Sequence, residues 1–343
     1  MTDRGMTHKQ TIGVIGAGAW GTALAQMLAS DGRDVILWAY EPEVTAAINA
    51  EHRNPLYLPS ATLAPTIRAT SNLADFAAID TVLVVTPAQV LGRVLGGLAR
   101  PPRDLVLCSK GIEAGTGRLM NDAAREASPG SAIAVLSGPT FAHEVAAGLP
   151  TAVTLACEGG RAQWERLAPA IARPAFRPYY SDDVTGAEIG GAVKNVLAIA
   201  CGVVEGLALG QNARAALIAR GFSEMLRFGE ALGAETETLS GLCGLGDLVL
   251  TCSSTSSRNF SLGKALGEGA SAADLMADRR TVAEGAHTAP VLADLAARRG
   301  IAMPIVAAVD AILKGEDARK VVAALLARPL RAELESDAKD LRA

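Results

Sequence analysis

Aromatic side chains are scarce in this 343-residue chain: Phe, Trp and Tyr make up 4% of it, although 50% of its residues are hydrophobic. We therefore expect a core built from Ala, Leu, Val and Ile. The chain also lacks an excess of basic residues. Its formal net charge is -4 with both signs mixed, which argues against nucleic acid as a partner. A chain of this length can form one large or two ordinary domains.

Paired cysteines, clustered histidines and long apolar runs are missing too. The cysteines show no C-x-x-C spacing, which predicts reduced thiols in a cytoplasmic protein and not a disulfide framework; they are Cys108, Cys157, Cys201, Cys243 and Cys252. The histidines lie far apart, so we predict no structural or catalytic metal. Residues 1–10 are polar, and no apolar run reaches the ~18 residues of a membrane span. We therefore predict neither a signal peptide nor a membrane span.

A glycine-rich turn stands near the N-terminus, between an apolar strand and a helical pattern. Gly16, Gly18 and Gly21 form a G-x-G-x-x-G sequence. In a dinucleotide-binding turn the first glycine permits a tight turn, the second admits the pyrophosphate, and the third lets the helix pack on the strand. Glu41 ends the next predicted strand, at the spacing of a ribose-binding carboxylate. These residues predict a dinucleotide site; the alternative is a turn of purely structural origin.

Strands and helices alternate through the first half of the chain. We predict strands at 11–16, 34–40, 81–86, 105–109, 132–137, 152–156 and 176–180, and a crossover helix at 22–30. This alternation predicts a doubly wound, mostly parallel sheet that binds its ligand outside the carboxyl ends of the strands. Turns at Thr86, Lys110 and Gly138 follow three of these strands. We expect them to line one crevice, unless they are ordinary polar loops.

Helical periodicity replaces the strand signals from Asp182 onward. Asp182 or Asp183 is predicted to cap a helix that reaches Leu207. Further helices are predicted at 213–232, 289–299, 304–314 and 319–327. We therefore predict two domains, an α/β domain over residues 1–184 and an all-α domain over residues 185–343. Because no flexible linker separates them, the first long helix should pack directly on the α/β domain.

Lys194 is the most informative ionisable residue in the second half. It lies in a small, apolar run where a buried charge is costly. Gly186, Gly190 and Gly191 lower helix propensity there and indicate the close approach of another backbone or a ligand. A lysine beside a nicotinamide can protonate a carbonyl oxygen as hydride reaches the carbon. The alternative is a surface lysine whose stem covers apolar side chains.

A second cluster of polar residues begins with glycines around Asp247 and continues through a hydroxyl-rich loop to Arg258. Arginine presents a planar fork of donors, and Ser257 and Asn259 can add neutral ones. The cluster therefore suits an oxyanion or a phosphate. The alternative is a solvated loop whose serines cap a helix.

Seven segments, in this order, resemble the bacterial NAD(P)-dependent sn-glycerol-3-phosphate dehydrogenases over nearly the whole chain. They are GAGAWGTALA from Gly16, SKGIE from Ser109, SGPTFAHEV from Ser137, GAVKNVLAIACG from Gly191, GLCGLGDLVLTC from Gly241, SRN from Ser257 and VAEG from Val282. The resemblance implies reversible hydride transfer between NAD(P)H and dihydroxyacetone phosphate, giving sn-glycerol 3-phosphate for glycerophospholipid synthesis. It also implies an N-terminal Rossmann domain followed by a helical domain like the C-terminal domain of 6-phosphogluconate dehydrogenase.

Roles carried over from this family assign the proton donor and acceptor to Lys194, with Lys110 and Asp247 completing the catalytic set. A second lysine nearby, like burial, should ease the deprotonation of Lys194. The expected substrate-binding residues are Lys110, Gly138, Thr140, Lys194, Asn195, Asp247, Ser257, Arg258 and Asn259. The expected cofactor-binding residues are Gly16, Gly18, Ala19, Trp20, Gly21, Tyr40, Glu41, Lys110, Ala142, Arg258, Val282 and Glu284.

One position departs from the family. Many relatives carry a basic residue or histidine at the end of the second strand, where this chain has Tyr40 followed by Glu41. A carboxylate there suits a free ribose 2′-OH and repels a 2′-phosphate, which favours NAD over NADP.

Two other functions compete with this one. One alternative is another β-hydroxyacid dehydrogenase, but those enzymes place an asparagine one helical turn after the lysine, where this chain has Ala198. The other is a dinucleotide sensor without turnover. The sequence leaves the oligomeric state open, a homodimer included.

Overall fold

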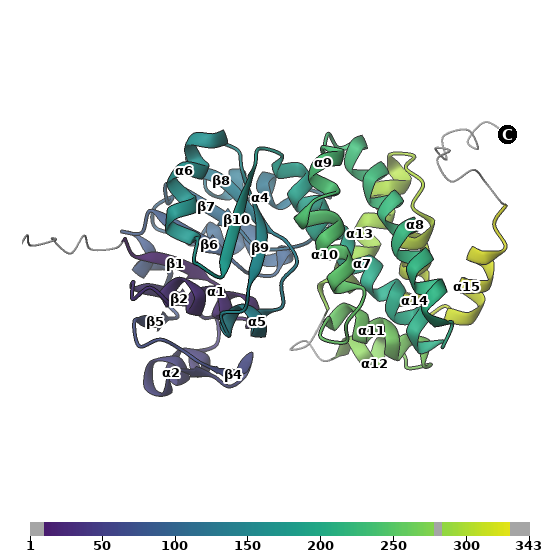
Figure 1. The fold of residues 1–343 in the computed structure, drawn as a ribbon, viewed down its shortest axis with the longest axis horizontal. Helices are drawn as coiled ribbons and strands as arrows, with labels where there is room; N and C mark the ends of the chain where they lie inside the picture. The colour runs from purple at the N-terminus through teal and green to yellow at the C-terminus, as the bar shows by residue number, and fades with distance from the viewer. Residues whose placement is uncertain (1–9, 278–282, 330–343) are drawn as a thin grey trace, which may run out of the picture.

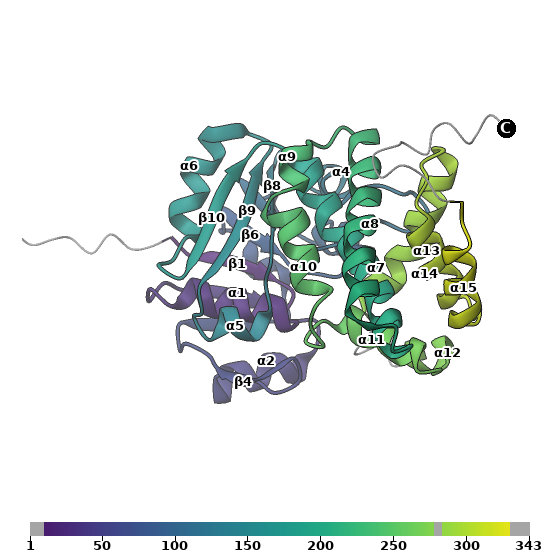
Figure 2. The ribbon, with the colours of Figure 1, turned by 45° about the vertical axis from the view of Figure 1, so that its right-hand side comes forward.

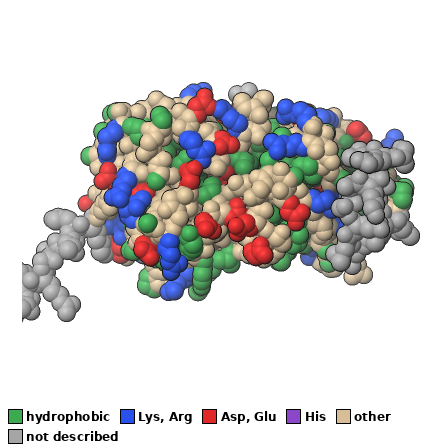
Figure 3. Space-filling model, turned by 90° about the horizontal axis from the view of Figure 1, so that it is seen from above, with side chains coloured by type: hydrophobic (Ala, Val, Ile, Leu, Met, Phe, Trp, Pro, Cys, Tyr) green, Lys and Arg blue, Asp and Glu red, His purple; other side chains and the backbone are tan. Residues whose placement is uncertain are grey.

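The computed structural model describes residues 10–277 and 283–329, which form a β-sheet region followed by a helical region (Figure 1). The last strand of the sheet ends at Ser181, and the first long helix, α7 (Val184–Gly206), begins directly after it. The two regions lie side by side along the long axis of the molecule (Figure 1). On the face seen in Figure 3, Lys and Arg side chains are interspersed with Asp and Glu.

An eight-stranded sheet forms the first region, in the order β10-β9-β8-β7-β6-β1-β2-β5. Neighbouring strands in it are parallel except for the antiparallel pair β8–β9, so the predicted mostly parallel sheet is confirmed. Its strands are β1 (Ile12–Ile15), β2 (Val35–Trp38), β5 (Ile67–Thr70), β6 (Thr81–Val84), β7 (Asp104–Leu107), β8 (Ala132–Ser137), β9 (Thr151–Cys157) and β10 (Phe176–Ser181).

The sequence prediction missed the segment between β2 and β6. It contains β5 and a separate antiparallel pair, β3 (Arg53–Asn54) and β4 (Leu58–Thr62). These strands are short, and β4 alternates poorly between buried and exposed residues, so no periodicity marks them.

Alternate strand residues pack into two cores, one on each face of the sheet. Val14 and Leu83 face one core, and their neighbours Ile15 and Val84 face the other. The first core is covered by α1 (Ala19–Ala29), α2 (Pro42–Glu51), α5 (Ala142–Ala146) and α6 (Gly160–Ile171). The second is covered by α3 (Leu91–Leu95), α4 (Met120–Ala127) and the start of α7. Figure 2 shows α5 lying against α1.

Helix α7 forms the centre of the helical region. Asp183 caps it by accepting a hydrogen bond from Gly186 N at 2.7 Å, as predicted. Within the described residues, α7 is the one helix long and apolar enough to cross a membrane, but its apolar window is entirely buried in the protein. It is therefore a core helix. Around it lie α8 (Gly210–Ala231), α9 (Thr236–Leu239), α10 (Asp247–Thr251), α11 (Arg258–Gly267), α12 (Ala272–Ala277), α13 (Glu284–Arg298), α14 (Pro304–Leu313) and α15 (Ala318–Leu326).

Helices α7 and α11 cross in backbone contact because glycines face each other. A Cβ atom on Gly202 would lie 2.1 Å from Phe260 O, and one on Gly263 would lie 2.0 Å from Ile199 O. Any side chain at these positions would push the helices apart. The glycines thus set where the first turn of α11 lies relative to α7.

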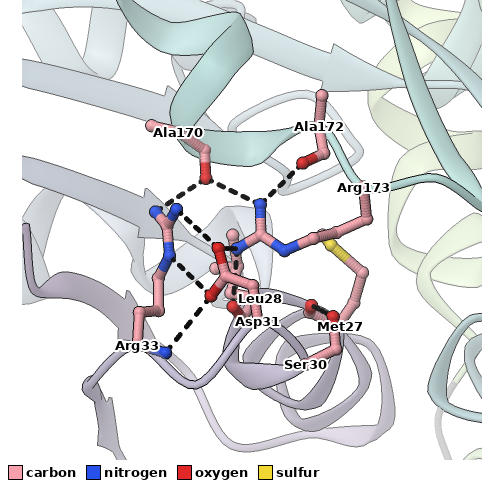
Figure 4. A network of polar contacts seen from close by, with 8 residues as sticks. All are labelled: Met27, Leu28, Ser30, Asp31, Arg33, Ala170, Ala172 and Arg173. Atoms are coloured by element: carbon pink, nitrogen blue, oxygen red, sulfur yellow. Dashed lines mark hydrogen bonds and ion pairs between the residues drawn. The ribbon is translucent and has the colours of Figure 1, made fainter. Parts of the chain in front are cut away.

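Buried arginines tie the end of α1 to α6 and to the segment before β10 (Figure 4). Arg33 donates to both carboxylate oxygens of Asp31, at 3.2 and 3.0 Å, and to Ala170 O at 2.8 Å. Arg173 donates to Ala170 O at 3.1 Å and to Leu28 O at 2.6 Å, and its guanidinium lies 3.4 Å from Asp31 Oδ2. Although burial opposes ionisation, the hydrogen bonds and charges of the arginines lower the pKa of Asp31 to about 2.

We expect Asp31→Asn to lower the free energy of unfolding by about 2–3 kcal/mol, because it leaves two buried guanidinium groups without a carboxylate. Since the pKa of Asp31 is lowered from 3.8 to about 2, its contribution is present above about pH 4 and is lost as the pH falls through 2. Urea unfolding of both proteins at pH 7 measures the difference. Asp80→Asn, which breaks the exposed Arg100–Asp80 pair, is the matched control and should change stability by less than ~1 kcal/mol. Equal effects of the two substitutions would contradict the prediction.

Candidate active site

The glycine-rich turn joins β1 to α1, as predicted. Gly16 has a φ of +113°, and a Cβ atom there would lie 2.8 Å from Val85 O. A Cβ atom on Gly21 would lie 1.8 Å from Gly16 O, so the helix rests directly on the turn. At Gly18, by contrast, no described atom lies within 4 Å of the Cβ position. Gly16 and Gly21 therefore shape the turn. Gly18 leaves space beside the N-terminus of α1, where a pyrophosphate can bind.

Polar atoms in α1 and at the carboxyl edge of the sheet also fit a bound dinucleotide. Trp20 Nε1, Thr86 Oγ1 and Ser137 Oγ are buried and have no hydrogen-bond partner among the described residues. Thr86 and Ser137 lie at the carboxyl ends of β6 and β8, the edge of the sheet where this fold binds its ligands. Buried polar atoms are rarely left unpaired, so a ligand at this edge would explain them.

The three turns that follow β6, β7 and β8 lie together, because these strands are parallel neighbours. Ser109 Oγ donates to Thr86 O at 2.5 Å, which joins the first two turns. Gly138 has a φ of +158°, and a Cβ atom there would lie 2.9 Å from the Cα of Val153. Thr140 Oγ1 donates to Gly138 O at 3.3 Å. The turns therefore lie together at one edge of the sheet.

Two lysines from opposite halves of the chain share one buried carboxylate. Lys110 Nζ lies 2.7 Å from Asp247 Oδ2, and Lys194 Nζ lies 2.5 Å from Asp247 Oδ1. Asp247 is fully buried and Lys194 is only 5% exposed. The alternative of a surface lysine at position 194 is therefore wrong. The cluster also joins the sheet region to the helical region.

Thr251 is a member of this cluster that sequence reasoning missed. It accepts a hydrogen bond from Lys194 Nζ at 3.0 Å, and its Oγ1 lies 3.3 Å from Asp247 Oδ1. Thr251 follows Asp247 by one helical turn on α10, so the two side chains share a helix face. That spacing could have identified it.

The two lysines differ in their acidity. Burial lowers the pKa of Lys194 to about 8; the positive charge of Lys110 acts in the same direction, and Asp247 opposes both. For Lys110, burial also acts to lower the pKa, but the ion pair with Asp247 outweighs it and the pKa rises. Lys110 therefore stays charged, while Lys194 can gain and lose a proton near neutral pH. The direction for Lys194 is the one predicted from the sequence.

Close backbone packing holds Asp247 against α7. A Cβ atom on Gly190 would lie 2.4 Å from Cys243 O, and one on Gly244 would lie 1.9 Å from Leu239 O. The first contact seats a single wide helical turn, η3 (Leu242–Gly246), on α7, and the second packs it against the end of α9, immediately before α10. Of the three glycines singled out in the sequence, Gly190 thus marks the close approach of another backbone, whereas a Cβ atom on Gly186 or Gly191 would meet side chains instead.

The hydroxyl-rich loop ends at the start of α11. Ser257 caps this helix by accepting a hydrogen bond from Phe260 N at 3.2 Å, so the alternative of a helix-capping serine is correct for this residue. Its hydroxyl hydrogen can still be donated to a ligand. Arg258 follows at the first helical position and its side chain is exposed.

Asn259 joins three helices beside the lysine cluster. Its Nδ2 donates to Asn195 Oδ1 on α7 at 3.0 Å, and its Oδ1 accepts from Gly285 N on α13 at 2.9 Å. Helix α13 begins at Glu284, earlier than the predicted residue 289, so that Glu284 stands at its N-terminus. Burial raises the pKa of Glu284, although the charges of Arg258, Lys110 and Lys194 oppose the rise. Glu284 therefore lies within electrostatic reach of Arg258 and of both lysines.

The remaining expected cofactor residues that the structure describes stand at the starts of helices or just after a strand. Ala19 begins α1 and Ala142 begins α5. Tyr40 is 78% exposed after the end of β2, and Glu41 is the N-cap of α2. Val282 lies outside the described residues. Within those residues, no group of three His, Cys, Asp or Glu side chains could hold a metal ion, and all the cysteines are buried free thiols.

Fold and site together define a Rossmann-type dehydrogenase with a helical second domain. Residues 11–163 match the family described as the NAD-dependent glycerol-3-phosphate dehydrogenase N-terminus. Residues 183–323 match the family described as the C-terminus of the same enzymes. The chain belongs to the NAD-dependent glycerol-3-phosphate dehydrogenase family.

Similar proteins cover nearly the whole chain. A glycerol-3-phosphate dehydrogenase (NAD(P)+) from Erythrobacter litoralis is 76% identical over 327 residues, which are 95% of this chain and 99% of that protein. One of the same name from Novosphingobium aromaticivorans is 75% identical over 323 residues, 94% of this chain and 98% of that protein. A glycerol-3-phosphate dehydrogenase structure from Coxiella burnetii has a TM-score of 0.88 and 39% identity, covering 94% of this chain and 100% of that one.

Proposed function

We propose that this protein transfers hydride reversibly between NAD(P)H and dihydroxyacetone phosphate, giving sn-glycerol 3-phosphate. The observation that carries the proposal is the buried Lys110–Asp247–Lys194 cluster at the edge of the sheet that binds the dinucleotide. The names of the most similar relatives support the same reaction. A non-catalytic sensor would not need a buried lysine that titrates near neutral pH.

The chain's own residues supply the proton chemistry. When bound, the reduced nicotinamide supplies the hydride that reaches the central carbon of the substrate. Lys194 holds the proton at Nζ, donates it to the carbonyl oxygen, and takes it back in the reverse direction. Asp247 and Thr251 fix the direction of that amine through their hydrogen bonds. Lys110, which stays charged, is a donor for a polar end of the substrate.

Substrate binding is assigned to the residues that surround this cluster. Arg258, Ser257 and Asn259 at the start of α11 grip the phosphate with charged and neutral donors. Gly138 and Thr140 line the opposite side, in the turn after β8. Binding energy from the phosphate orients the carbonyl for attack, because it is gained away from the reacting atoms.

We also propose finer features of this enzyme. NAD is the preferred cofactor, because Glu41 stands where a carboxylate accepts a ribose 2′-OH and repels a 2′-phosphate. The Rossmann domain spans residues 1–184 and the helical domain residues 185–343. The reaction takes place in the cytoplasm, and its product enters glycerophospholipid synthesis.

A comparison of substrates with and without the phosphate tests the function. We expect unphosphorylated dihydroxyacetone to show a lower kcat as well as weaker binding, because the phosphate orients the reacting carbonyl. Arg258→Met should lower kcat/KM for dihydroxyacetone phosphate by about 10- to 100-fold and leave the rate with dihydroxyacetone nearly unchanged. The change in NADH or NADPH absorbance at saturating cofactor measures the rates with both substrates. Arg319→Met, on the exposed helix α15, is the control. Equal kcat values for the two compounds would refute the role of the loop.

The pKa of Lys194 predicts opposite pH profiles for the two directions. Reduction needs the protonated amine, so its kcat/KM should fall as the pH rises through about 8. Oxidation of glycerol 3-phosphate needs the neutral amine, so its kcat/KM should rise through the same pH and then level off. Initial rates between pH 6 and 10 measure both profiles. Two profiles that change in the same direction around pH 8 would exclude Lys194 as the acid and base.

A further inference from the structure

The segment between α2 and β5 makes contact with the dinucleotide turn. It contains β3 and β4, and β4 lies beside α2 in both ribbon views (Figure 1 and Figure 2). Asn54, in β3, is fully buried and donates from Nδ2 to Ala17 O and to Thr22 Oγ1, each at 2.8 Å. Ala17 lies within the glycine-rich turn, and Thr22 lies in the first turns of α1. Asn54 therefore anchors this segment to the turn that holds the pyrophosphate.

Tyr57 carries the same connection on to Glu41. Its backbone N donates to Asn54 Oδ1 at 3.2 Å, and its phenol hydroxyl donates to Glu41 Oε1 at 2.8 Å. The Tyr57 ring is half-buried and packs on the same core as Trp20. We call Asn54 and Tyr57 the brace, because together they link the glycine-rich turn to the carboxylate at the end of β2.

A glutamate side chain without such a partner would populate several rotamers at the surface, since it turns about three bonds. The hydrogen bond from Tyr57 selects one of them. Tyr57 occupies a single site on Oε1, so the rest of the carboxylate can accept a hydrogen bond from a ribose hydroxyl. A carboxylate held in one place also repels a 2′-phosphate more strongly than one that can turn away into water.

We propose that Tyr57 is a specificity-determining positioning residue: the brace fixes Glu41 toward the ribose 2′-OH, and so sets the preference for NAD(H) over NADP(H). The inference rests on the proposed function and extends it to residues outside the family motifs. Tyr57 thus contributes to discrimination between NAD(H) and NADP(H) through its hydrogen bond to Glu41. No direct contact between Tyr57 and the nucleotide is needed.

A double-mutant cycle on Glu41 and Tyr57 tests the brace. Fluorescence titration gives the Kd values of NADH and NADPH for wild type, Glu41→Ala, Tyr57→Phe and the double variant. Wild type should bind NADH more tightly, and Glu41→Ala should remove most of that preference. Tyr57→Phe should reduce the NADPH/NADH ratio of Kd values by about three- to tenfold. It should have no further effect once Glu41 is alanine, because the residue it positions is then gone.

Tyr179→Phe, at a half-exposed tyrosine on β10 far along the sheet from β2, is the matched control and should leave both Kd values unchanged. If Tyr57 served only the stability of the segment, Tyr57→Phe would weaken both nucleotides equally and leave the ratio constant. A constant ratio would overturn the inference. So would a Tyr57→Phe effect on the NADPH/NADH ratio of Kd values that is equally large in the Glu41→Ala background. A wild type that prefers NADPH would overturn it as well. A wild type that binds neither nucleotide would instead refute the proposed function itself.

Discussion

Replacing Lys194 by methionine is expected to lower kcat for dihydroxyacetone phosphate reduction by about 10²–10⁴-fold, the usual contribution of a general acid. Methionine has nearly the length of the lysine stem and fills the same buried space, but it has no amine that can donate a proton. The variant keeps the carboxylate of Asp247 paired with Lys110, whose Nζ lies 2.7 Å away. The loss should therefore appear in turnover and leave NADH binding close to that of wild type.

Loss of NADH absorbance with saturating substrate measures kcat, and fluorescence titration measures NADH binding. Lys264→Met is the matched control, because Lys264 forms an exposed pair with Glu268 on α11 and has no contact with the lysine cluster. It should retain the wild-type rate. A Lys194→Met protein that turns over at the wild-type rate would remove the central element of the mechanism.

Asp247→Asn is expected to impair both stability and turnover. It leaves two lysines, at 2.5 and 2.7 Å from the carboxylate oxygens in wild type, without a counter-charge in a site where Asp247 is fully buried. Breaking a buried ion pair from one side costs about 3–5 kcal/mol of unfolding free energy. Because Asp247 acts to raise the pKa of Lys194, its loss should also lower that pKa below 8 and deplete the acid form at neutral pH.

The stability loss of Asp247→Asn should depend on pH in a defined direction. The pKa of Lys194 in the folded protein lies below its ordinary value of 10.5, so the unfolded chain binds more protons between the two values. Wild type therefore gains stability as the pH rises across that interval. Without Asp247 the pKa of Lys194 is lower still, so the variant begins to gain stability at a lower pH, and its deficit should be smaller at pH 10 than at pH 7. Urea unfolding at both pH values measures it, with Asp294→Asn in the exposed Arg298 pair as the control. A deficit that grows with pH would contradict the electrostatic explanation.

Local patterns explain why much of the first region could be predicted. Parallel strands that are covered on both faces appear in the sequence as short apolar runs, as in β1 and β6. The G-x-G-x-x-G turn lies between the first of these runs and a helix. Asp183 as a helix cap depends on one residue and the backbone that follows it. Such features involve residues close in sequence, and for this reason a single sequence can show them.

Other residues of the site left no local signal. Asn54 reaches Ala17 and Thr22 across 37 and 32 residues of sequence, and Tyr57 reaches Glu41 across 16. No periodicity or motif marks an asparagine or tyrosine that hydrogen-bonds to another segment. Thr251 is intermediate, because its spacing from Asp247 is visible in the sequence while its bond to Lys194, 57 residues away, is not.

The order of residues alone was sufficient to predict the Rossmann fold, the helical second half and the residues that we propose carry the chemistry. The sequence also predicted the direction in which the pKa of Lys194 shifts, but the size of that shift depends on the folded structure. Lys110 and Lys194 are 137 and 53 residues from Asp247, and a lysine pKa depends on burial and on charges brought close by packing. The sequence indicates the lysine, and burial in the folded protein lowers its pKa to about 8.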